Sequence, residues 1–88
     1  MHANGKILYV GKTERPAALD LVLEGQGYQI LTARGVDDAL RILAVRDFEA
    51  LVVEARLLDQ DPEEWQRVRD IQPRLPVLGI SERHDSAM

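Results

Sequence analysis

The chain has 88 residues, of which 45% are apolar, so it can form one small domain around one hydrophobic core. It contains no cysteine, which excludes disulfide scaffolds, thiol catalysis and cysteine-ligated metal sites. The net charge of −4, the lack of a signal-peptide core and the lack of an apolar run of about 20 residues predict a cytoplasmic domain with no membrane span and no direct nucleic-acid contact.

The first half of the chain predicts two strands and two helices. Short apolar, β-prone runs over residues 7–10 and 28–32 are typical of strands buried in a sheet. Between them, apolar residues at helical spacing predict a helix with Pro16 in its first turn, which ends at the glycine-rich turn 25–27. A second helix is predicted over 36–43, because apolar residues recur there every three or four positions.

The second half continues the alternation of strand and helix. Residues 50–53 predict a third strand, and residues 55–60 are expected to form a loop. An N-cap candidate followed by proline at 61–62 predicts the start of a third helix, which ends before Pro73. Residues 76–80 predict a fourth strand.

The element order predicts an α/β domain with a parallel sheet covered by helices on both faces, as a single three-layer unit. We expect one domain over residues 1–88, with its core in 6–81 and a polar tail at 82–88. In such sheets a functional site lies at the carboxyl ends of the strands. The residues predicted at these ends are Gly11–Thr13, Ala33–Arg34, Glu54–Arg56 and Ser81–Glu82.

Five stretches of the chain follow a known pattern. They are the strand Lys6–Val10, the passage Glu24–Ala33, the helix Asp38–Leu43, the segment Asp47–Val53 and the strand Leu75–Ser81. In this order, and with matching gaps, they resemble the receiver domain of bacterial response regulators. The resemblance implies a flavodoxin-like fold that is incomplete here, with a strand order of 2-1-3-4.

The resemblance also implies where a phosphorylation site would lie. In that family two acids after the first strand hold Mg²⁺, and these positions fall on Gly11 and Lys12. The aspartate that accepts the phosphoryl group falls on Glu54, and the position whose carbonyl binds the metal falls on Arg56. The hydroxyl that contacts the phosphoryl group is matched by Ser81, whereas the position of the family's lysine is not covered by the chain.

These departures predict a degenerate receiver domain. Mg²⁺ binding should be weak or absent, because one acid is lost and Lys12 is positive. We therefore expect no cofactor, no metal site, no enzymatic activity and no ordinary phosphorylation. The expected role is in two-component signal transduction or transcription regulation, through contacts with a protein partner such as an output domain, a kinase or another regulator.

Two interpretations of Glu54 remain open. Its negative charge resembles that of a phosphorylated aspartate, and pairing with Lys12 or Arg56 would then lock the site in one state. Alternatively, Glu54 is an acid at a strand end that is merely solvated or paired, and most ion pairs near a surface stabilise little.

The sequence stops after the fourth predicted strand, so that strand becomes an open sheet edge and the first helix loses a neighbour. We expect a homo-oligomer that covers these surfaces. The chain is either a fragment of a longer regulator or a natural truncated receiver-like protein.

A competing interpretation is a small α/β enzyme or binding protein that holds a phosphorylated ligand at Lys12, Arg56 and Ser81. Gly11–Thr13 resembles the tail of a phosphate-binding loop, but Lys6 stands where that motif needs its first glycine. The acids over 59–64 are expected to form a helix start, and Trp65 is expected in the core. His2 and His84 have no metal-ligand spacing.

Overall fold

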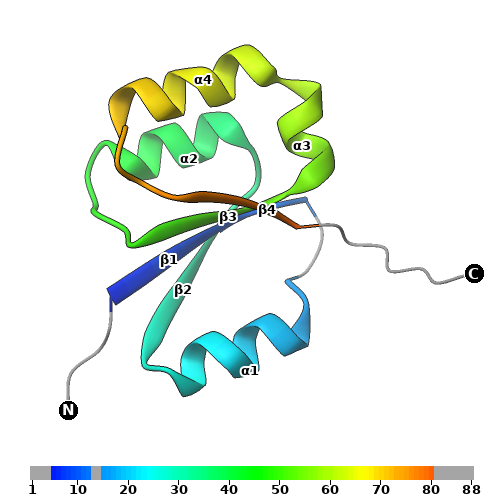
Figure 1. The fold of residues 1–88 in the computed structure, drawn as a ribbon, viewed down its shortest axis with the longest axis vertical. Helices are drawn as coiled ribbons and strands as arrows, with labels where there is room; N and C mark the ends of the chain where they lie inside the picture. Colours follow the sequence, from blue (N-terminus) through cyan, green and yellow to red (C-terminus); the bar gives the residue numbers. More distant parts are fainter. Residues whose placement is uncertain (1–4, 13–14, 81–88) are drawn as a thin grey trace, which may run out of the picture.

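The computed structural model describes residues 5–12 and 15–80, which form four strands and four helices (Figure 1). Ser81, His2 and His84 lie outside the described residues. The elements in chain order are β1 (Gly5–Val10), α1 (Ala17–Gly25), β2 (Tyr28–Ala33), α2 (Val36–Leu43), β3 (Ala50–Glu54), α3 (Ala55–Gln60), α4 (Pro62–Ile71) and β4 (Val77–Ile80).

The strands form one parallel sheet in the order β2-β1-β3-β4. The predicted α/β class and the predicted strand order are confirmed, and the arrangement is that of a flavodoxin-like sheet. β1 is central: its Tyr9 pairs with Thr32 on one side and with Val52 on the other. The carboxyl ends of β1 and β3 therefore lie side by side, which positions the candidate site.

Alternation along the strands divides the core between the two faces of the sheet. One face is covered by α2, α3 and α4, and α1 lies on the opposite face (Figure 1). The buried residues of the first face are Leu8, Val10, Ala33, Ala39, Leu43, Leu51, Val53, Leu57, Trp65 and Val68. Those of the α1 face are Ile7, Tyr9 and Val52.

Helix α1 packs on its face of the sheet with only part of its apolar surface. Leu19 and Leu23 contact the core of that face, but no residue of α1 is fully buried. Leu21 and Val22 are 76% and 62% exposed. The helix ends as predicted: it stops at Gly25, and Gly27 follows with a φ of 92° that favours glycine.

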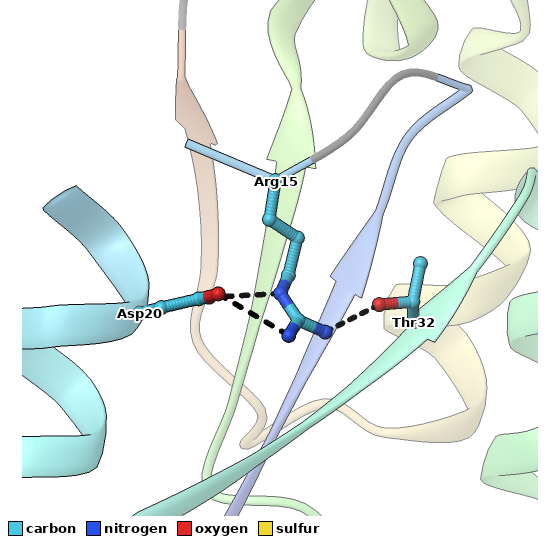
Figure 2. Close-up of polar contacts among 3 residues, drawn as sticks. All are labelled: Arg15, Asp20 and Thr32. Atoms are coloured by element: carbon cyan, nitrogen blue, oxygen red, sulfur yellow. Dashed lines mark hydrogen bonds and ion pairs between the residues drawn. The ribbon is translucent and has the colours of Figure 1, made fainter. Parts of the chain in front are cut away.

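Arg15 connects the start of α1 to the edge strand β2 (Figure 2). Its Nε and one terminal nitrogen donate to the carboxylate of Asp20, at 2.8 and 3.3 Å. The other terminal nitrogen donates to Thr32 Oγ1 at 2.7 Å. The guanidinium thus forms a forked pair with the acid and also reaches the neighbouring strand.

The prediction of a loop over residues 55–60 is wrong, because these residues form helix α3. Leu57 is buried, and Leu58 packs against the same core. The carbonyl of Leu57 also accepts a hydrogen bond from the indole N–H of Trp65 at 2.9 Å. Tertiary contacts of this kind order a short segment whose sequence alone shows no helical periodicity.

The other predicted elements agree in type, with most ends shifted by one or two residues. The prediction that Pro16 lies in the first turn of a helix is wrong, because α1 begins at Ala17 and Pro16 is its N-cap residue with an extended backbone. Trp65 is buried, as predicted. Asp61 is the N-cap residue of α4 with proline in the first turn, also as predicted, but its side chain makes no capping hydrogen bond. The first turn of α4 instead carries Glu63 and Glu64, whose charges suit the positive end of a helix.

Candidate functional site

The candidate site lies where β1 and β3 end. Val10 and Val53 form the last pair between these strands, so Gly11 and Glu54 follow one step further along each chain. Lys12 comes next after β1, and Arg56 is an exposed residue in the first turn of α3. The structure therefore brings together Gly11, Lys12 and Glu54, as the sequence pattern predicts for strand ends of a parallel sheet.

Glu54 is the buried charged residue of the described chain, with 1% of its surface exposed. Its Oε1 accepts a hydrogen bond from the backbone N–H of Lys12 at 3.2 Å. Its Oε2 accepts a long hydrogen bond from the hydroxyl of Tyr9 at 3.4 Å. Burying a carboxylate without such partners costs free energy, so Glu54 needs these hydrogen bonds to stay in its buried position. Glu54 is thus directed toward β1 and held there.

Gly11 provides the space that this arrangement needs. A Cβ atom at residue 11 would lie 2.8 Å from Cδ of Glu54 and 2.8 Å from Cε2 of Tyr9, closer than real Cβ contacts. The backbone of Gly11 is itself fixed, because its N–H donates to the carbonyl of Ala33 at 3.0 Å. The glycine and the glutamate are therefore complementary: the volume that Gly11 leaves empty after β1 is where the carboxylate of Glu54 comes across from β3.

Lys12 contacts Glu54 through its backbone and not through its ammonium group. The N–H of Lys12 donates to Oε1, while the residue as a whole is exposed. This differs from the ion pair that one interpretation of the sequence expects between the two side chains. The position of the Glu54 carboxylate therefore depends on a main-chain donor, which would survive a change of the Lys12 side chain.

The described residues at this edge do not fit a divalent metal ion. Within residues 5–12 and 15–80, no group of three or more histidine, cysteine, aspartate or glutamate residues could hold a metal. Magnesium prefers oxygen ligands, and here the carboxylate of Glu54 already accepts bonds from an N–H and an O–H donor. Of the residues at the family's metal positions, Gly11 has no side-chain ligand and Lys12 is positive.

Two residues of this region were not identified from the sequence. Tyr9 is predicted only as part of a strand, yet its hydroxyl reaches Glu54. The alternation of side chains along β1 could have indicated this, because Tyr9 lies two residues before Gly11 and on the same face. Arg15 precedes α1, and no pattern in the sequence indicates its contacts with Asp20 and Thr32.

Replacing Tyr9 with phenylalanine tests the contact between the ring hydroxyl and Glu54. We expect Tyr9→Phe to lower the free energy of unfolding by about 1 kcal/mol, because a buried carboxylate loses a donor while the ring packing is kept. Chemical denaturation of both proteins measures the difference. The matched control is Tyr28→Phe, at a tyrosine whose residue is partly exposed on β2. Equal effects at the two tyrosines would show that the Tyr9 hydroxyl has no special partner.

None of the described helices is long and apolar enough to cross a membrane. Comparison with known proteins found no matching family model, no matching curated protein and no matching solved structure.

Proposed function

We propose that the chain is a degenerate receiver domain that acts in signal transduction or transcription regulation through contacts with a protein partner, without accepting a phosphoryl group. The observation that carries the proposal is the position of Glu54, which occupies the phosphoacceptor position of the family pattern but is buried and bonded to Tyr9 and Lys12. The sheet order is compatible with this family, since flavodoxin-like sheets share it.

The position of Glu54 works against a role as nucleophile. Phosphoryl transfer needs an exposed oxygen aligned with the bond that breaks, and small displacements cost much of the rate. With 1% of its surface exposed, Glu54 has its carboxylate turned toward β1. An incoming phosphodonor would have to displace these hydrogen bonds before it could reach either oxygen.

The surrounding charges support the same conclusion. A receiver neutralises the incoming phosphoryl charge with a metal ion, which two acids after the first strand attract. Here that position holds Gly11, whose missing side chain makes room for Glu54, and the exposed Lys12. The carboxyl group of Glu54 is therefore held in one place, and a partner would meet one constant state instead of two interconverting states.

A phosphorylation assay tests the proposal. We expect no mass increment of a phosphoryl group on the 88-residue chain after incubation with acetyl phosphate and Mg²⁺, as measured by intact-protein mass spectrometry. The Glu54→Ala variant is the matched control, because modification that persists in it lies elsewhere. Stoichiometric phosphorylation that is lost in Glu54→Ala would contradict the proposal.

The competing function, binding of a phosphorylated ligand, requires positive groups that converge on this edge. Lys12 and Arg56 are both exposed near it, and Ser81 lies outside the described residues. The buried carboxylate of Glu54 between the two strand ends repels an anion at close range. A thermal-shift screen with inorganic phosphate and nucleotides separates the two functions: stabilisation that depends on Lys12 would support ligand binding and count against the receiver proposal.

A further inference from the structure

Strand β4 has an unpaired edge among the described residues. It pairs with β3 on one side only. The N–H of Leu51 donates to the carbonyl of Pro76 at 2.9 Å, and this bond shows which residues of β4 direct their backbone groups toward β3. Because backbone groups of a parallel strand alternate between its two sides, Leu78 and Ile80 face β3. The N–H and C=O groups of Val77 and Gly79 then face outward.

This edge lacks the features that usually prevent pairing with another chain. The residues of β4 are Val77, Leu78, Gly79 and Ile80, and none is charged. The backbone of Pro76 faces β3, so the N–H that proline lacks is not missing from the outward side of the strand. Leu78 is 54% exposed, on the face of the sheet that carries α1, because it pairs with Val52. Uncharged, apolar edges of this kind are prone to edge-to-edge association.

We propose that β4 pairs with β4 of a second copy of this chain, antiparallel and about a two-fold axis through Leu78, to form a continuous eight-stranded sheet. In this register Val77 lies opposite Gly79 of the second copy, and each such pair exchanges two hydrogen bonds. All outward groups of Val77 and Gly79 are then bonded. Leu78 meets its own copy as a non-hydrogen-bonded pair, with the two Cα atoms about 4.5 Å apart.

The charges of α4 favour a second copy of the same chain as the occupant. Helix α4 leads into β4, and it packs beside α2, which covers β1 and β2, and beside α3, which contacts β3 and β4. The two-fold axis would set two α4 helices antiparallel on the same face. The start of α4 carries Asp61, Glu63 and Glu64, and the later part and the turn after it carry Arg67, Arg69, Asp70 and Arg74. Each acidic start would thus face a basic end, which favours the antiparallel arrangement.

A single cysteine at position 78 tests the register directly, because the chain has no cysteine of its own. The expected Cα separation of the pair is within the range that a disulfide allows. We expect Leu78→Cys to form a covalent dimer on oxidation, seen on a non-reducing gel. The matched control is Leu21→Cys on α1, at a residue that is 76% exposed but away from β4. Cross-linking at position 21 that is as fast as at position 78 would overturn the proposal.

A charge swap tests the symmetry. Multi-angle light scattering and sedimentation should show a dimer for the 88-residue chain. Leu78→Lys and Leu78→Glu should each weaken the dimer by about tenfold or more, because like charges meet across the axis. Mixing the two variants should restore a dimer that contains one copy of each. Leu21→Lys should leave the dimer unchanged. A monomer at all concentrations, or a mixture that stays monomeric, would overturn the proposal.

Discussion

Replacing Gly11 with alanine is expected to lower the free energy of unfolding by about 2–3 kcal/mol. The added Cβ would lie 2.8 Å from Cδ of Glu54 and 2.8 Å from Cε2 of Tyr9. Both side chains are buried, and Glu54 is also bonded to the backbone of Lys12, so neither moves away without losing contacts. Urea denaturation, followed by circular dichroism, measures the change.

Two comparisons make this result specific. Gly25→Ala adds the same methyl group at the end of α1, where nothing lies within 4 Å of the new atom, so we expect no loss of stability there. In a Glu54→Ala background, Gly11→Ala should cost less, because only the contact with Tyr9 remains. If the cost is the same with and without the Glu54 side chain, then the two residues are not complementary in the way the structure indicates.

Replacing Trp65 with alanine is expected to lower the free energy of unfolding by about 3–5 kcal/mol, which is a large part of the stability of a small domain. The indole is buried in the core of the sheet face that α2, α3 and α4 cover, and its N–H donates to the carbonyl of Leu57 at 2.9 Å. The substitution removes a large apolar side chain and leaves the end of α3 without this contact. Loss of the cooperative transition in urea would be the expected result.

The Trp65→Phe variant separates packing from the hydrogen bond. We expect it to fold and to be destabilised by less than Trp65→Ala, because most of the ring contacts are kept while the donor to Leu57 is lost. Leu21→Ala is the surface control, and it should change stability by about 0.5 kcal/mol or less. A Trp65→Ala protein as stable as the parent would contradict the central place of Trp65 in the core.

Periodicity and turn residues predict most of this fold. The apolar runs at 7–10 and 50–53 indicate the central strands, and the alternation of strands with helices indicates the parallel sheet and its order. Helix α3 is missed because six residues give too few turns for a helical period, and because its order depends on contacts of Leu57 and Trp65. Local sequence does not contain such long-range contacts.

The site is predicted in position but not in geometry. Strand ends place Gly11, Lys12 and Glu54 at one edge, as the structure confirms. The direction in which the Glu54 side chain turns is set by three features that are distant from Glu54 in the sequence. They are the hydroxyl of Tyr9, the main-chain N–H of Lys12 and the empty volume beside Gly11. Local sequence spacing does not encode these contacts, because the partners are 42 to 45 positions apart in the chain.

The contacts of Arg15 imply that the free energy of local unfolding differs between parts of the molecule. Helix α1 contains no fully buried residue, in contrast to α2 and α4, and it contacts the sheet through a narrow stripe. The forked pair with Asp20 and the bond to Thr32 fasten the first turn of this helix to strand β2. Fluctuations in which α1 detaches would thus begin at its far end near Gly25, and they would leave the helical layer on the other face of the sheet intact.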